Sequence, residues 1–145
     1  MPDRTVWVFF YGSFINRRVL ADHGFDPGPV ESACVWGYDI RIAPLATLVP
    51  ADGRCAYGLV CRATHADLDK LYGQAWVSAY RPEAVVARTA DGRLVPALCY
   101  VAPPAPALPA TGEYIDRIAG PAREHGFPAW YVERIEGFRP RPSAE

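Results

Sequence analysis

Residues 6–15 decide the fold; they read Val-Trp-Val-Phe-Phe-Tyr-Gly-Ser-Phe-Ile. The apolar run from Val6 to Phe10 predicts a buried strand, and the Tyr11-Gly12-Ser13 step predicts that it leads into a tight turn. Glycine at position 12 has no Cβ, so the backbone there can take unusual dihedral angles and approach a ligand closely. Consecutive backbone N–H groups in such a turn can hold an anion. The segment from Tyr11 to Ile15 is therefore the first candidate for a site, and the alternative is a tight strand-to-helix connection without a ligand.

Apolar alternation predicts a series of strands after this turn. The expected strands are residues 30–42 (bent near Gly37), 47–49, 55–62, 80–89 and 94–101. Pro50-Ala51-Asp52-Gly53 predicts a reversal of the chain, and Asp91-Gly92 predicts a hairpin. Residues 55–62 carry small or apolar side chains on both faces, so this strand is expected at the centre of the sheet.

Short helices are expected between the strands and after them. Asn16 is the expected N-cap of a helix that reaches Ala21, and Thr64 with Asp67 forms a capping box for a helix that Gly73 ends. Two further helices are predicted at 113–124 and 129–136. Because strands outnumber helices, we expect one α+β domain over residues 1–145, a mixed β-barrel with peripheral short helices. The proline-rich residues 103–109 predict an extended spacer within this domain, and residues 139–145 a frayed tail.

The amino-acid composition and the net charge limit the kinds of partner that the chain can be expected to bind. The chain has 145 residues, half of them hydrophobic, and a formal net charge of -1, which argues against disorder and against nucleic acid or an anionic membrane as partner. No apolar run is long enough to span a bilayer and no secretory signal is visible, so a cytoplasmic location is expected. The four cysteines lack metal-ligand or disulfide spacing, as do the three histidines, so no metal site is expected. The expected partner is a small molecule or a protein.

Three motifs in this order resemble the gamma-glutamylcyclotransferase-like family. The family signature Tyr-Gly-Ser-Asn-Leu after a first strand is similar to Tyr11-Gly12-Ser13-Phe14-Ile15, with Phe14 in place of Asn. The family's Leu-Asp-x-x-Glu-Gly and following Tyr match residues 68–73 and Tyr80, and its late Gly-Leu-Pro-x-x-Tyr matches residues 126–131. Tyr72 occupies the position of the family's catalytic Glu.

The resemblance implies a barrel fold and a reaction without cofactor or metal. In that reaction the substrate's α-amino group attacks its own γ-carbonyl, which releases an amine and 5-oxoproline. The backbone amides of Gly12 to Ile15 would hold the substrate carboxylate, with Tyr11 in the same loop, and Tyr80 would line the pocket. Tyr72 would stand where the acid–base group is needed. Because Phe14 replaces an amide by an apolar ring, the resemblance also implies a changed specificity.

The residue that moves the proton stays open. An ordinary phenol has a pKa near 10, so Tyr72 is a weak base unless a cation lowers that pKa, and a buried helix aromatic is the alternative interpretation. Glu83 and Asp69 are the nearest acids in the sequence. Arg41 can bind a carboxylate through two hydrogen bonds, although an ion-paired sheet face accounts for it equally well. Ser13 has no nucleophile motif around it and is expected to cap the turn.

Three functions follow as hypotheses. The first is a gamma-glutamylcyclotransferase-like enzyme, a transferase or lyase that acts on a gamma-glutamyl amine or a related small amino-acid derivative bearing a carboxylate. The second is a binding module that keeps the pocket without turnover, or an enzyme of altered chemistry on the same fold, because the catalytic Glu is absent. The third is an interaction protein that uses the fold only as a scaffold.

Overall fold

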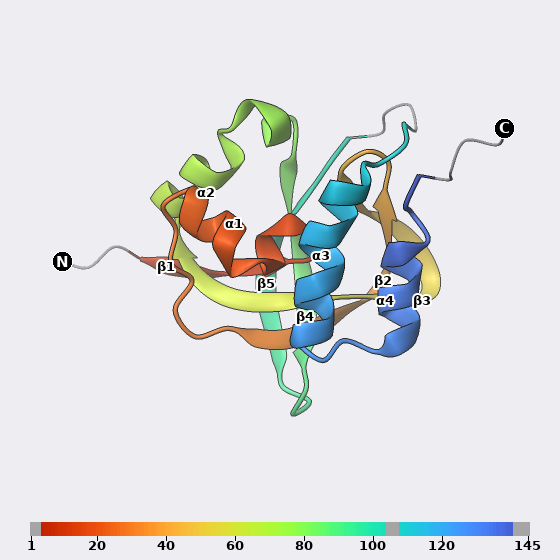
Figure 1. Cartoon of the computed structure of the whole chain (residues 1–145). Coiled ribbons are helices and arrows are strands. Elements are labelled where there is room, and N and C mark those ends of the chain that lie inside the picture. The colour runs from red at the N-terminus through yellow and green to blue at the C-terminus, as the bar shows by residue number, and fades with distance from the viewer. Residues whose placement is uncertain (1–3, 104–107, 141–145) are drawn as a thin grey trace, which may run out of the picture.

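The computed structural model describes residues 4–103 and 108–140. Within them, five strands close into a barrel in the order β1-β3-β2-β4-β5, and four α-helices lie outside it (Figure 1). The strands are β1 (Thr5–Phe10), β2 (Glu31–Ile42), β3 (Ala46–Thr64), β4 (Arg81–Thr89) and β5 (Leu94–Val101). The predicted mixed β-barrel with peripheral short helices is confirmed.

β3 has a strand on each side, as its two-sided apolar pattern predicted, although a closed barrel has no central strand. It pairs antiparallel with β1, where Val8 lies opposite Cys61, and antiparallel with β2. Gly58 allows this packing, because a Cβ there would lie 2.2 Å from the carbonyl oxygen of Phe10. The first strand therefore sits closely against the C-terminal end of β3.

The predicted reversal at residues 50–53 is wrong. β3 continues through these residues as one strand of 19 residues beside β2. Trp36 pairs with Cys55 and Tyr38 pairs with Pro50, so residues 51–54 lie opposite Gly37 alone. The proline and glycine signals therefore mark a bulge inside a long bent ribbon, where Gly37 and Gly53 take positive φ angles of 87° and 76°.

Two contacts close the barrel, and both of them are short. β4 and β5 form the predicted hairpin around Asp91-Gly92, and β5 runs parallel to β1 where Leu98 lies opposite Val8. β2 and β4 pair only at Ala33–Thr89 and Cys34–Arg88. Beyond Cys34, β2 has no ladder pairing with β4, so the two strands are free to separate toward the Arg81 end of β4.

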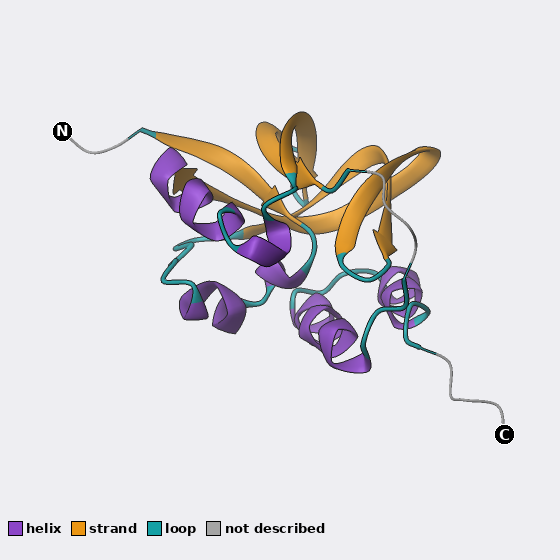
Figure 2. Cartoon of the chain, turned by 90° about the horizontal axis from the view of Figure 1, so that it is seen from above, coloured by secondary structure: helices purple, strands orange, loops and turns teal. Residues whose placement is uncertain are grey.

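The helices gather mostly on one side of the strands (Figure 2). They are α1 (Arg17–Asp22), α2 (His65–Tyr72), α3 (Gly112–Glu124) and α4 (Ala129–Glu136), with two 3₁₀ turns at Ser13–Ile15 and Ala75–Val77. The predicted caps form: the Asn16 side chain accepts from the amides of Arg18 and Val19, and Thr64 and Asp67 make the capping box. α3 packs on α4 and on the first 3₁₀ turn, which places it over the end of β1.

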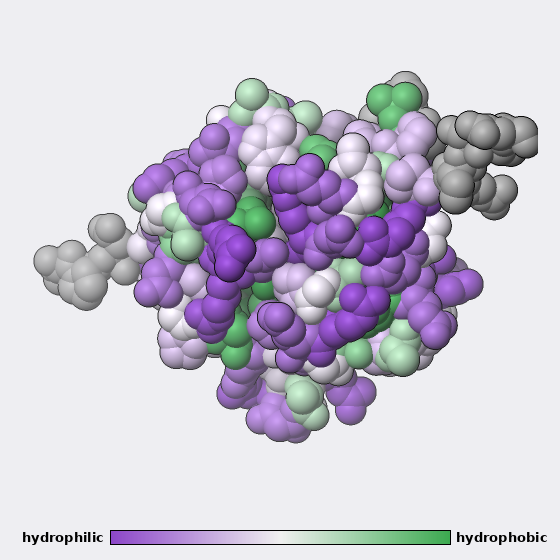
Figure 3. Space-filling model, viewed as in Figure 1, coloured by the Kyte–Doolittle hydropathy of each residue, from purple (hydrophilic) through white to green (hydrophobic). Residues whose placement is uncertain are grey.

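A continuous apolar core joins the barrel to these helices. Its largest fully buried side chains include Phe9, Phe10, Ile115 and Tyr131. The face toward the viewer in Figure 1 is covered mainly by hydrophilic residues (Figure 3). Within the described ranges, no helix is long and apolar enough to cross a membrane.

The predicted spacer at residues 103–109 and the predicted tail at residues 139–145 are only partly described by the structure. Residues 104–107 of the expected spacer and 141–145 of the expected frayed tail lie outside the described residues. Arg139 begins that predicted tail, yet its guanidinium contacts Asp116 at 2.5 Å and also pairs with Glu136. The chain is therefore anchored one residue further than the prediction of fraying allowed.

Candidate functional site

The candidate site begins where β1 ends and the chain turns into the first 3₁₀ turn. Gly12 stands at this junction with φ -104° and ψ -138°. A Cβ on Gly12 would lie 2.9 Å from the Cβ of Ala46 at the start of β3, closer than side chains normally approach. The glycine is therefore required by contact with β3.

The backbone amides of this turn are only partly used by the protein. The Ile15 amide donates to the Gly12 carbonyl at 3.1 Å, and the Asn16 amide donates to the Ser13 carbonyl at 3.0 Å. The amides of Gly12, Ser13 and Phe14 make no hydrogen bond to any residue that the structure describes. The expectation that all four amides from Gly12 to Ile15 face a ligand therefore needs a correction, because the Ile15 amide is spent within the turn.

A small cavity is lined in part by the three residues that carry these amides. Its volume is about 30 Å³, which leaves room for about two water molecules. Its walls come from β1, the turn, the start of β3, α2, the second 3₁₀ turn and α3. The lining residues are Phe10, Tyr11, Gly12, Ser13, Phe14, Ala46, Tyr72, Trp76, Val77, Tyr80 and Tyr114.

Aromatic rings fill most of the space around the cavity. The Phe14 ring meets the Tyr72 ring edge to face at 5.3 Å and the Trp76 ring at 5.8 Å between centroids. On its other side, Tyr72 stacks on Tyr100 with centroids 3.8 Å apart and planes 9° from parallel. The Phe14 ring therefore fills part of the cavity that a smaller side chain would leave open for a ligand.

Most of the hydroxyl groups in the wall already have partners. The Tyr11 hydroxyl donates to the Tyr100 carbonyl at 2.6 Å, and the Tyr80 hydroxyl donates to the Ala46 carbonyl. The Tyr114 hydroxyl accepts from the Ala46 amide at 3.0 Å. The Tyr72 hydroxyl, in contrast, makes no hydrogen bond to residues 4–103 or 108–140. A ligand can therefore engage the Tyr72 hydroxyl without breaking an existing hydrogen bond.

Burial keeps these phenols protonated. It is the main cause that raises the pKa of Tyr72 well above its ordinary value, and the nearby Cys99, Tyr100 and Tyr80 raise that pKa further. Burial likewise raises the pKa of Tyr11 and of Tyr80. The phenolate of Tyr72 is therefore disfavoured at neutral pH, and its hydroxyl is a hydrogen-bond donor that is poorly suited to act as a base.

Among the lining residues, all of them described, there is no carboxylate and no imidazole. Glu83 lies exposed on β4, where it accepts from the Tyr38 hydroxyl at 3.3 Å and lines a neighbouring cleft. Asp69 is exposed on α2 and does not line the cavity. Neither acid lines the cavity at the turn.

The structure brings together most of the predicted site residues. Tyr11, Gly12, Ser13, Phe14, Tyr72 and Tyr80 line the cavity together. Ile15 does not line the cavity, and its side chain belongs to the apolar core. Sequence reasoning missed Ala46, Trp76, Val77 and Tyr114, which reach the cavity from distant elements. No local motif marks them, although an aromatic residue three positions after the cap Thr111 could have suggested a buried helix face.

Comparisons with known proteins agree with this architecture. The solved structure of a gamma-glutamyl cyclotransferase superimposes with a TM-score of 0.80 at 19% identity, covering 98% of this chain and 92% of that one. An uncharacterized protein from Homo sapiens gives the same TM-score of 0.80 at 19% identity, covering 99% and 93%. A yeast gamma-glutamyl cyclotransferase specific to glutathione gives 0.67 at 12% identity, covering 94% and 98%. At these identities the likeness shows the fold.

No curated protein sequence matches the chain. The family model described as gamma-glutamyl cyclotransferase, AIG2-like, matches residues 8–117, which include the turn, α2, Tyr80 and the first residues of α3. Because this match covers more than half of the chain, the protein belongs to the AIG2-like gamma-glutamyl cyclotransferase family.

Proposed function

We propose that the turn binds the carboxylate of a gamma-glutamyl amine or a related small amino-acid derivative, and that the chain acts on it as a gamma-glutamylcyclotransferase-like protein with an altered acid–base apparatus. The observation that carries this proposal is the row of three successive amides, Gly12, Ser13 and Phe14, without an acceptor in the described structure and next to a cavity. Amides in such a row favour an anionic group. The membership of the family supports a cyclotransferase-type reaction.

The reaction moves one proton and exchanges one C–N bond for another. The substrate's α-amino nitrogen attacks its γ-carbonyl carbon, the amide C–N bond breaks, and the proton lost by the amine ends on the leaving nitrogen. The products are 5-oxoproline and an amine. Anchoring the carboxylate contributes mainly orientation, which accounts for much of the rate in an intramolecular attack.

Tyr72 can assist this reaction only as a donor. Its raised pKa keeps the proton on the phenol, so the hydroxyl can hydrogen-bond to the γ-carbonyl oxygen but does not take a proton from the amine. The amine must then lose its proton to water or to another substrate group. A slow reaction is the expected consequence.

Binding also requires the aromatic wall to open. A cavity of about 30 Å³ is far smaller than the roughly 300 Å³ of the smallest usual ligand pockets. Trp76 is the wall residue best placed to move, because it is 39% exposed and sits on a short 3₁₀ turn. We expect substrate binding to displace Trp76 from Phe14, which tryptophan fluorescence can follow.

Binding without turnover is the second candidate function. The specific observation in its favour is that no group lining the cavity is a carboxylate or an imidazole. One assay separates the two functions: the purified chain is incubated with a panel of gamma-glutamyl amides and dipeptides, and both 5-oxoproline release and melting temperature are measured. Release supports the enzyme, and a raised melting temperature without release supports the binding module. A panel that changes neither would refute both and leave the scaffold role.

A matched pair of variants tests the amides themselves. Ser13→Pro deletes one of the three N–H groups at the first position of the 3₁₀ turn, where proline is tolerated, while Ser13→Ala keeps the amide. A hydrogen bond to a charged group is worth about 1.5–3 kcal/mol, so Ser13→Pro should weaken ligand binding roughly tenfold to a hundredfold. Equal affinities for the two variants would show that the turn amides do not hold the ligand.

A further inference from the structure

A second, larger cleft lies on the other side of Tyr80 from the turn. Its volume is about 530 Å³, which falls within the range of ligand pockets. It opens where β2 and β4 have parted beyond their last paired residues, Cys34 and Arg88. Tyr80 lines both spaces, and its hydrogen bond to the Ala46 carbonyl fixes the partition between them.

Two opposite charges line this cleft from different strands. Arg41 projects from β2 and Glu83 from β4. In the described part of the chain they form no ion pair, with each other or with any other residue. Asp39, two residues before Arg41, is already taken by Arg134 through contacts of 2.8 and 2.5 Å. Arg41 therefore keeps its guanidinium for an outside partner.

The remainder of the cleft is mainly apolar and is held in place. Leu45, Leu48, Val49 and Val101 contribute hydrocarbon surface. The Ala102 amide donates to the Thr47 hydroxyl at 2.9 Å, which ties the end of β5 to β3. The Tyr38 hydroxyl donates to the Glu83 carboxylate at 3.3 Å and so orients it. Arg41 and Glu83 are both exposed, so a ligand can reach them from solvent while its apolar part lies against the walls.

We infer that this cleft binds a small zwitterion, a free amino acid or dipeptide with an apolar side chain, whose carboxylate pairs with Arg41 and whose ammonium pairs with Glu83. The planar guanidinium is suited to a carboxylate through two parallel hydrogen bonds. The apolar walls receive the side chain of the ligand. The inference does not rest on the proposed function, because the three turn amides lie in the other cavity.

The test uses isothermal titration with L-phenylalanine and two derivatives that each lack one charge. N-acetyl-L-phenylalanine has no ammonium group, and L-phenylalaninamide has no carboxylate. The chain should bind L-phenylalanine about tenfold or more tightly than either derivative, because each derivative lacks one of the two charged groups that the cleft would pair with. Failure of L-phenylalanine, L-leucine and leucyl-glycine alike to bind would overturn the inference.

Two variants assign the charges. Arg41→Gln should weaken L-phenylalanine binding about tenfold and should abolish the preference for the acid over its amide. Glu83→Gln should do the same for the ammonium group and the acetylated derivative. Arg54→Gln is the matched control, because Arg54 is exposed on β3 and does not line the cleft. An unchanged preference in Arg41→Gln would refute the assignment even if binding persisted.

The Ser13→Pro variant separates a test of the cleft from a test of the proposed function, because it changes only the turn. That variant should bind a gamma-glutamyl amide at the turn roughly tenfold to a hundredfold more weakly and should keep its affinity for L-phenylalanine in the cleft. Loss of both in a folded protein, checked by circular dichroism, would mean that the two cavities form one site and would overturn the separate cleft.

Discussion

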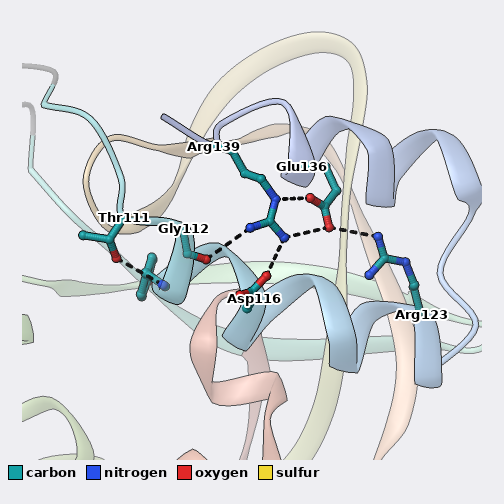
Figure 4. Close-up of polar contacts among 7 residues, drawn as sticks. Thr111, Gly112, Asp116, Arg123, Glu136 and Arg139 are labelled. Carbon is teal, nitrogen blue, oxygen red and sulfur yellow. Dashed lines mark hydrogen bonds and ion pairs between the residues drawn. The ribbon is translucent and has the colours of Figure 1, made fainter. Parts of the chain in front are cut away.

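The cavity at the turn and the ion-pair cluster between α3 and α4 use polar groups in opposite ways. In the cluster, Arg139 joins the Gly112 carbonyl, Asp116 and Glu136, and Arg123 reaches Glu136 at 2.9 Å (Figure 4). Every charge there has a partner within the protein. The cavity has no charged side chain in its wall, and its three amides have no acceptor in the described structure.

The difference shows where a ligand's charge can be accommodated. Paired charges at a half-exposed surface contribute little to stability and offer little to a ligand, because they are already satisfied and screened by solvent. Backbone N–H groups without an acceptor in an apolar pocket can instead interact with a negative charge that the ligand brings. In the proposed function the turn holds the anionic group of the ligand, and no carboxylate or imidazole lines the cavity to move a proton. Each prediction below changes either the cavity or the ion-pair cluster.

Tyr72→Glu should have the largest effect, because it places a carboxylate in the uncharged cavity. An apolar site raises the pKa of a carboxyl toward neutrality, where it is most useful as a proton shuttle. We expect 5-oxoproline release from a responsive gamma-glutamyl amide to rise about 10²–10⁴-fold, the usual contribution of a general acid–base group. Tyr72→Gln is the control, because its side chain has the same length as that of Glu. A similar gain in both variants would show that removal of the ring was enough without the carboxylate.

Tyr72→Phe tests whether the hydroxyl of Tyr72 contributes to turnover. Unchanged turnover would exclude this hydroxyl from proton transfer and from hydrogen bonding to the substrate.

Phe14→Ala should have the next largest effect, on stability. Phe14 is 5% exposed and contacts Tyr72, Trp76 and Phe10 through its ring. Its loss should lower the free energy of unfolding by about 3 kcal/mol, measured by urea denaturation, because a buried phenyl group leaves a cavity behind. Leu94→Ala, at an exposed position (65%), should change the free energy of unfolding by much less. A small effect at Phe14 would mean that the aromatic wall is loosely packed and can open to a ligand without cost.

Gly12→Ala should have an intermediate effect on stability and on binding. The new methyl would meet the Cβ of Ala46 at 2.9 Å, so the turn must shift away from β3. We expect a loss of about 1–3 kcal/mol, typical of overpacking, together with weaker ligand binding at the turn. Gly120→Ala in α3 is the matched control: a Cβ there meets no atom within 4 Å, and alanine favours a helix by about 1 kcal/mol. Gly12→Ala with wild-type stability would contradict the close approach of the turn to Ala46.

Much of the fold could be predicted because its signals are local. The cap residues Asn16 and Thr64 and the Asp91-Gly92 hairpin each act within a few residues, and each formed as expected. The signal at Pro50 to Gly53 was equally strong but was misinterpreted. Whether proline and glycine produce a reversal or a bulge depends on the partner strand, and here pairing of β2 on both sides of Gly37 keeps β3 extended.

The cavity could be predicted only in part for the same reason. The turn and Tyr72 belong to short motifs, and the structure places them together. Ala46, Trp76 and Tyr114 enter the wall only through tertiary packing, and the loss of the Ile15 amide to the Gly12 carbonyl depends on the 3₁₀ conformation of the turn. That Arg41 and Glu83 share one cleft depends on where β2 and β4 separate, which no local pattern records.

Glu136→Gln should have the smallest effect, because it removes a charge from the cluster where every charge is paired. The hydrogen bond from Arg139 is the main cause that lowers the pKa of Glu136 below its ordinary value, and Arg123 adds to it. A carboxyl with a lowered pKa in the folded state stabilises the protein at pH values above its unfolded pKa, and that contribution is lost as the pH falls through the folded pKa. The variant should therefore be less stable than wild type by no more than about 1 kcal/mol at pH 7, and the difference should shrink in high salt and disappear in acid.

Urea denaturation of both proteins between pH 3 and pH 7 measures this difference in the free energy of unfolding. Glu124→Gln, at an exposed position of α3, is the control. A difference that persisted in acid would mean that Glu136 stabilises the fold through packing contacts. The ion pairs of the cluster would then contribute little to stability.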